Sequence, residues 1–333
     1  MLYRLLYTIF VSCIFVVALS LLSFSCTRDE SFRQEGHQEE LQKWFADNGK
    51  IKVLCTTSMV ADVVQRVGGD AIDCLTLIRG EHDPHSYQLV KGDDEKFSRA
   101  DIVFYNGLGL EHGPSLHRYL EPSAKAFSLG EYVRQMHPES VLYADGVADP
   151  HIWMDMYLFS ETCPFIAEEL NKIRPNPQFA ENCRASMLAL QELSCTLQSK
   201  LRAIPEAKRY LVTSHDAFTY FTRRYLAEPT ECVDESFRRR CQAPEGLAPE
   251  SQMSTADIQR IVEYIVQHSI HVIFTESNVS RDSIKKLQDA ASGKNHIVCI
   301  ASKALYADSM GKAGDYAEMM QHNVEVLVHE WQK

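Results

Sequence analysis

Short apolar runs alternate with helical patterns along most of this chain. Residues 51–56 have the pattern of a buried strand, and helical periodicity follows until Val67, where a Gly-Gly pair stops it. Further strand-like runs cover 73–77 and 102–105, and the second run ends at an Asn-Gly turn. Strands that alternate with helices predict an α/β fold, in which a mostly parallel sheet is flanked by helices.

The second half of the chain repeats this layout after one long helical stretch. Residues 176–203 carry apolar positions at helical spacing without an interior Gly or Pro, which predicts a single long helix. Beyond it, a helical pattern covers 256–268, and the segment 228–250, rich in Pro, Arg and Glu, is expected to be a surface insertion. The strand-like runs of this half are 210–212, 271–274 and 297–300.

The N-terminus has the pattern of an export signal. A positive charge precedes the apolar run 5–24, so we expect residues 1–25 to be a signal peptide. Residues 26–49 are polar and predict a tether, with Cys26 as the residue that would carry a lipid. Ser23 stands where such lipoprotein junctions usually have Leu, and a membrane-spanning helix is the alternative for the same run. Both interpretations place the folded part outside the cytoplasm.

Composition narrows the class further. The chain has 333 residues, of which 45% are hydrophobic and 24% charged, as in an ordinary soluble globular protein. Its formal net charge of -11 argues against nucleic acid as a partner, because phosphate contacts need clustered Lys and Arg.

The cysteines show no zinc-finger spacing. Cys232 and Cys241 flank a charged loop, where a disulfide can form in an oxidising compartment, and we leave this pairing open. Cys55, Cys74 and Cys299 lie in or beside apolar runs and are expected to be buried free thiols.

Two histidines directly follow an Asp-Pro pair. His85 lies in the segment 80–88, and His151 lies in the segment 149–155. Proline fixes its own φ and favours extended geometry in the preceding Asp, so each imidazole is expected on a stiff loop. A preset imidazole loses little entropy when it binds a metal, and we therefore predict one metal site assembled from both loops.

Three more residues follow predicted strands. His215 comes after the strand at 210–212, Glu276 after the strand at 271–274, and Asp308 after the last strand. Ligands in such folds bind beyond the carboxyl ends of parallel strands, although carboxylates there also cap helices. Neighbours that would orient the imidazoles, or instead cap helices, are His82, Asp83 and Asp149.

Four segments in this order and spacing resemble the extracytoplasmic metal-binding proteins of zinc/manganese ABC importers, the TroA/ZnuA type. The segments are 82–87 (HDPHSY), 149–155 (DPHIWMD), 215–221 (HDAFTYF) and 305–309 (LYADS). The resemblance extends over roughly residues 50 to 330. Gln88 departs from it, because the family usually has Glu there, and the His-rich acidic loop of many zinc members is absent.

The resemblance implies two α/β lobes, 50–175 and 205–333, joined by one rigid helix at 176–204, with the metal site in the cleft between the lobes. The metal ligands that it implies are His85, His151, His215 and Asp308. It further implies a monomeric, non-enzymatic solute-binding protein of the periplasm, lipid-anchored or free. Such a protein captures one divalent transition-metal ion and delivers it to a cognate ABC permease with its ATPase.

The metal and two other functions stay open at this stage. Three imidazoles and one carboxylate favour zinc, whereas a bidentate Asp308 would make manganese or iron acceptable. A surface adhesin on the same fold is one alternative. A metal-dependent hydrolase is another, but it needs an open coordination position and a general base, as in His-Glu-x-x-His, which this sequence lacks.

Overall fold

The computed structural model describes residues 39–249 and 253–333. The predicted signal peptide and Cys26 lie outside these residues, and so does most of the predicted tether at 26–49. Residues 39–45 form a short helix, in a part of the chain that separates as its own unit from Lys50–Lys333. The unit Lys50–Lys333 carries every candidate site residue.

This unit begins with a four-stranded parallel sheet of strand order β2-β1-β3-β4. In its register, Val53 lies opposite Cys74 on one side and Ile102 on the other. The strands are β1 (Ile51–Cys55), β2 (Ile72–Thr76), β3 (Ile102–Tyr105) and β4 (Ala126–Ser128). The helices of this region are α2 (Ser58–Gly68), α3 (Asp93–Arg99), α4 (Pro114–Leu120) and α5 (Leu129–Met136).

Local sequence signals set the ends of α2. The Thr57 side chain accepts the N–H of Val60 at the first turn, as an N-cap does. Gly69 follows the last residue with φ of 54°, a left-handed conformation that a side chain would disfavour. The predicted strand–helix–stop pattern at 51–69 is therefore confirmed, and β2 begins one residue earlier than the run at 73–77.

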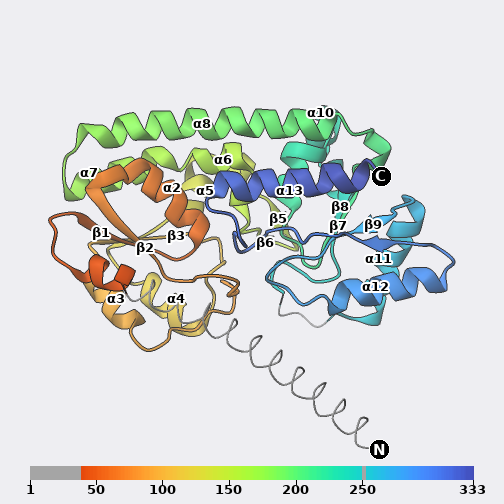
Figure 1. Ribbon diagram of the computed structural model, residues 1–333, viewed down its shortest axis with the longest axis horizontal. Helices are drawn as coiled ribbons and strands as arrows, with labels where there is room; N and C mark the ends of the chain where they lie inside the picture. The colour runs from red at the N-terminus through yellow and green to blue at the C-terminus, as the bar shows by residue number, and fades with distance from the viewer. Residues whose placement is uncertain (1–38, 250–252) are drawn as a thin grey trace, which may run out of the picture. The chain divides into compact units, whose positions relative to one another are not determined.

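The long helix α8 (Pro177–Arg202) connects this region with the next. Asn176 caps it by accepting the N–H of Gln178, and Pro177 occupies its first position, where no N–H is needed. It packs against α2, α6 (Met156–Ser160), α7 (Cys163–Ile173) and α13 (Tyr316–Trp331) (Figure 1). The helix predicted at 176–203 is confirmed, with its two end residues serving as caps.

Paired strands make up the second region. β7 (Leu211–Val212) pairs parallel with β8 (Cys241–Gln242), and β9 (Val272–Ile273) pairs parallel with β10 (Cys299–Ile300). The N–H of Phe274 donates to the carbonyl of Val212 at 2.9 Å and links the two pairs. The helical segments here are α9 (Thr219–Phe221), η5 (Thr222–Leu226), α10 (Pro229–Val233), η6 (Ser236–Arg240), α11 (Thr255–Gln267) and α12 (Asp282–Gly293). A short antiparallel hairpin of β5 (Tyr143–Ala144) and β6 (Val147–Ala148) precedes this region.

The parallel sheets with flanking helices confirm the α/β fold. One apolar core extends through both regions, from Ile51 to Trp331, and a smaller core gathers around Ile273 between α11 and α12. The division into lobes at 50–175, 176–204 and 205–333 stays a prediction. The segment 228–250 is only partly a surface insertion. The strand β8 lies inside it, and Arg240 is buried in ion pairs with Glu206 and Glu231.

The cysteine expectations are met in part. Cys232 and Cys241 are both free, the first exposed and the second buried, so no disulfide joins them. Cys55 is buried and Cys74 half-buried, with their Sγ atoms 3.5 Å apart. Cys299 is exposed, and its predicted burial is wrong because it lies on the outward side of β10, which pairs only with β9 among the described strands.

Tyr220 provides a test of how the two regions are held together. Its buried hydroxyl accepts the N–H of Leu142 at 2.9 Å and donates to the carbonyl of Asp149 at 3.0 Å. We expect Tyr220→Phe to lower the free energy of unfolding by about 1–3 kcal/mol, because a buried N–H loses its acceptor. Urea denaturation of the metal-free protein measures this loss. Tyr143→Phe, at an exposed tyrosine, is the control, and equal midpoints for both variants would contradict the expectation.

Candidate metal site

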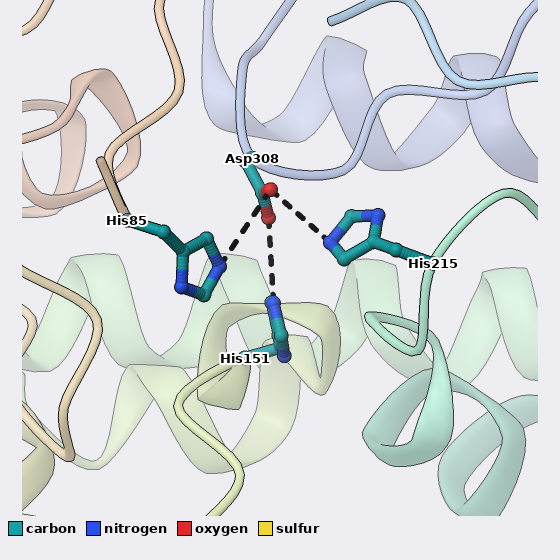
Figure 2. A group of neighbouring side chains, drawn as sticks. All are labelled: His85, His151, His215 and Asp308. Carbon is teal, nitrogen blue, oxygen red and sulfur yellow. Dashed lines mark ion pairs between the residues drawn. The ribbon is translucent and has the colours of Figure 1, made fainter. Parts of the chain in front are cut away.

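Four buried side chains from distant parts of the chain converge on one point (Figure 2). His85 lies in the loop after β2, and His151 lies between β6 and the short helix η3 (Ile152–Met154). His215 follows β7, and Asp308 follows the segment in which Leu305 forms a parallel bridge with Glu276. One ligand atom of each of the four residues lies within 4.8 Å of the others.

The three imidazoles point their Nε2 atoms at one carboxylate (Figure 2). Asp308 Oδ2 lies 3.1 Å from His215 Nε2 and 3.8 Å from His85 Nε2, while Oδ1 lies 3.4 Å from His151 Nε2. All three Nε2 atoms and Oδ1 of Asp308 are buried without a hydrogen-bond partner. Buried polar atoms are normally hydrogen-bonded, so four such atoms facing one point fit a bound cation.

Acidic residues orient two of the three imidazoles. Asp149 Oδ1 lies 2.7 Å from His151 Nδ1 and also accepts the backbone N–H of His151. Glu276 Oε2 lies 2.5 Å from His215 Nδ1, and its Oε1 accepts the backbone N–H groups of Ser214 and His215. In His151, a proton held on Nδ1 by Asp149 leaves the lone pair of Nε2 directed at the site, which is the arrangement found at metal-binding histidines, and Glu276 forms an ion pair with Nδ1 of His215.

The third imidazole is held through its backbone. Asp83 Oδ1 accepts the N–H of His85 at 2.9 Å, and Oδ2 accepts the hydroxyl of Ser86 at 2.6 Å. Asp83 therefore stabilises the turn around Pro84, not the tautomer of the ring. His82 is exposed. Of the three expected orienting neighbours, only Asp149 contacts an imidazole nitrogen.

Hydrogen bonds from other segments position Asp308. The indole N–H of Trp153 donates to the carbonyl of Ala307 at 2.9 Å, and Asn323 makes two hydrogen bonds with the backbone of Tyr306. Sequence reasoning assigned no role to Trp153 or Asn323. Their contacts span 154 and 17 residues, so the sequence does not show which backbone groups they meet, although Trp153 lies within the segment 149–155.

The electrostatics of the site favour a cation. Burial alone would lower the pKa of His151, but the carboxylates of Asp149 and Asp308 outweigh it and raise the pKa to about 9. Burial opposes the same change in His215, yet Glu276 and Asp308 raise its pKa well above the usual value. Burial lowers the pKa of His85 to about 3.

Asp308 completes this balance of charge. Burial would raise the pKa of its carboxyl group, but the surrounding imidazoles, His215 first among them, hold the pKa well below the usual value. At neutral pH and without a metal, the carboxylate of Asp308 is therefore negatively charged, and the imidazoles of His151 and His215 are positively charged. A metal ion would take the place of the protons on these two imidazoles.

The fold and the cluster together define an α/β protein built around a His3Asp site for a single metal ion. The chain belongs to the ZnuA family, zinc-uptake complex component A periplasmic, whose family model matches residues 53–330.

Individual relatives agree with this assignment. Metal-binding protein YtgA of Chlamydia pneumoniae is 39% identical over 85% of this chain and 86% of its own length. Zinc-binding protein TroA of Treponema pallidum is 30% identical over 85% of this chain and 89% of its own. The crystal structure of Fe(III)-bound YtgA from Chlamydia trachomatis is similar with a TM-score of 0.80 and 37% identity, and the match covers 84% of this chain and 97% of that one.

The structure brings together all four residues predicted to be metal ligands, and their coordination of a metal stays a prediction. Glu276, predicted only as an acidic residue at a strand end, lies against His215. Across 39–249 and 253–333, no helix combines the length and apolar character needed to cross a membrane.

Proposed function

We propose that this protein is the extracytoplasmic substrate-binding component of an ABC importer for a transition metal. It binds one ion through His85, His151, His215 and Asp308 and delivers the ion to a permease driven by its ATPase. The observation that supports this proposal most directly is the set of four buried, unpartnered ligand atoms within 4.8 Å of one another. We further propose that the protein acts as a monomer in the periplasm, tethered to a membrane through a lipid on Cys26.

The ligand chemistry defines the class of metal. The affinity of imidazole nitrogens is highest for zinc, lower for iron and lowest for manganese. Both carboxylate oxygens of Asp308 face imidazoles, so the carboxylate can bind in bidentate fashion and raise the coordination number. A higher coordination number admits manganese and iron beside zinc. Among the relatives, TroA is named as zinc-binding, the lipoprotein MntA of Bacillus subtilis, 31% identical, is named as manganese-binding, and the crystal structure of YtgA holds Fe(III).

A binding function fits the site better than catalysis. A metal hydrolase keeps an open coordination position for an activated water. Here four protein side chains, each at most 3% exposed, surround one point and supply a closed set of ligands. Such a site retains and releases an ion without a position for water chemistry.

Metal content and titration test the proposal. We expect elemental analysis of the purified protein to find one transition-metal ion per chain. Competitive titration of the metal-free protein with Zn²⁺, Mn²⁺ and Fe²⁺ should then give one binding event for each and rank the three. If the protein retains no metal at any concentration up to the millimolar range, the proposal is wrong. The adhesin function would then be tested next, by binding to host surfaces.

A further inference from the structure

Glu81 makes a contact that the metal ligands themselves do not explain. It is an exposed residue in the loop between β2 and His85, four positions before that histidine. Its Oε2 atom accepts two hydrogen bonds of 2.8 Å, one from the hydroxyl of Ser277 and one from the hydroxyl of Ser309. These partners lie 196 and 228 residues away along the chain.

Both serines are direct neighbours of acidic site residues. Ser277 follows Glu276, the partner of His215, and Ser309 follows Asp308. The two hydroxyl oxygens lie 3.3 Å apart, and the N–H of Ser277 donates to the carbonyl of Leu305 at 2.9 Å. A single carboxylate therefore contacts two of the three segments that bring negative charge to the site, those of Glu276 and Asp308 but not that of Asp149.

On its own side, Glu81 belongs to the segment that presents His85. Gly80 has a positive φ of 65°, and the Asp83 turn fixes the residues around Pro84. Glu81 lies between this turn and β2, and the two hydrogen bonds of its side chain connect the loop with the second region of the fold. The loop that presents His85 is thus fastened to the segment that presents Asp308.

A second hydrogen bond, made by Trp153, also holds the Asp308 segment, but it is more deeply buried than the Glu81 contact. Trp153, which donates to the carbonyl of Ala307, is 1% exposed, so water cannot replace its hydrogen bond without opening the core. Glu81 is exposed and Ser277 half-buried, so water reaches their hydrogen bond readily, whereas Ser309 is only 3% exposed. The Glu81 contact is accordingly the one that opens first, while the Trp153 contact stays closed.

We propose that Glu81 is a positioning residue, a latch that holds the His85 loop against the Asp308 segment and whose opening sets the rate of metal release. The proposal rests on the proposed function, because it describes how the same site releases its metal ion. Glu81 does not coordinate the metal. Its effect is expected on dissociation, since breaking the two hydrogen bonds frees the His85 loop from the Asp308 segment.

The dissociation rate of the metal tests the latch. The full-length protein is loaded with Zn²⁺, mixed rapidly with an excess of chelator, and followed by stopped-flow measurement. We expect Glu81→Ala to release Zn²⁺ about tenfold faster, equivalent to about 1.4 kcal/mol. The stoichiometry of one ion, the association rate and the melting temperature of the metal-free protein should not change. A merely structural role would lower that melting temperature instead.

Three further variants sharpen the test. Glu81→Gln keeps a carbonyl oxygen that both serines can donate to, so it should recover part of the slow release. Ser277→Ala combined with Glu81→Ala should release the ion no faster than Glu81→Ala alone, because both changes break one contact. Glu325→Ala removes a similarly exposed carboxylate on α13 and should behave as the unchanged protein.

The outcomes separate the latch from the function on which it rests. Release from Glu81→Ala within twofold of the unchanged protein, or additive effects of Glu81→Ala and Ser277→Ala, would overturn the latch alone. Failure of the unchanged protein to bind Zn²⁺, Mn²⁺ or Fe²⁺ would overturn the proposed function and the latch together.

Discussion

His151→Ala is expected to lower metal affinity by several orders of magnitude, the largest effect of any single substitution considered for this chain. The imidazole is fully buried, and its unpartnered Nε2 faces Asp308 at 3.4 Å. Its removal takes away one of four ligands and leaves the carboxylate of Asp149 without the ring that it orients. The loss should exceed the roughly 10- to 100-fold cost typical for a residue that only orients a ligand.

The metal-free fold should survive this substitution. Asp149 still accepts the backbone N–H at position 151, so the loop keeps its turn. Circular dichroism and thermal melting of the metal-free variant check this point, and competition with a chelator of known affinity measures the binding. His151→Gln, which is closer in size to histidine, provides a second variant if the alanine protein does not fold.

A matched control comes from a histidine on the surface. His117 is exposed on α4 and pairs with Glu121, so His117→Ala should leave metal affinity unchanged. Equal affinity in His151→Ala and His117→Ala would show that the buried cluster is not the metal site.

Local signals explain why the first region and the long helix were predictable. The ends of α2 and α8 depend on residues next to them in sequence, such as Thr57, Gly69 and Asn176. The strands of the second region were placed correctly but predicted too long. β7, β9 and β10 each pair over two residues, and the flanking residues Tyr210, His271 and Ile297 lie outside the strands, with Ile297 80% exposed.

Long-range contacts explain what could not be predicted. The strand β8 follows three consecutive arginines, a pattern typical of a surface segment, yet Arg240 is buried because it pairs with Glu206, 34 residues away, and with Glu231 of the same segment. In the site, the Asp-Pro-His context marked His85 and His151. Nothing local marks Glu81, because its partners lie more than 190 residues away.

Metal affinity is expected to fall continuously as the pH is lowered from 9 to 5, a wider range than free histidine would give. Protons compete with a metal for an unperturbed imidazole only below about pH 6.5, where the ring becomes protonated. Here the carboxylates of Asp149 and Asp308 overcome the effect of burial and raise the pKa of His151 to about 9, and the pKa of His215 is also raised. Both rings must release a proton to bind a metal, which costs up to about tenfold in affinity per pH unit for each ring.

The same shifts give the metal-free protein the opposite dependence on pH. A folded pKa above the unfolded value stabilises the fold below about pH 6.5, and this stabilisation is lost as the pH rises through the folded pKa of about 9 for His151. Raising the pH from 6.5 to 9 should therefore lower the melting temperature with a chelator present. Over the same range, a fixed low concentration of metal should raise the melting temperature increasingly above that of the metal-free protein, because binding strengthens.

Calorimetry in buffers of different ionisation enthalpy counts the protons directly. We expect about two protons to leave per metal ion bound at pH 7, since His151 and His215 are both protonated there, while the pKa of His85, lowered to about 3 by burial, leaves that ring neutral. Glu276→Gln removes the charge nearest to His215 Nδ1 and should reduce the count. Affinity that is constant from pH 9 to 5, with no proton release, would contradict a site made of these histidines. In that case the buried charges around Asp308 would serve the fold and not the binding of an ion.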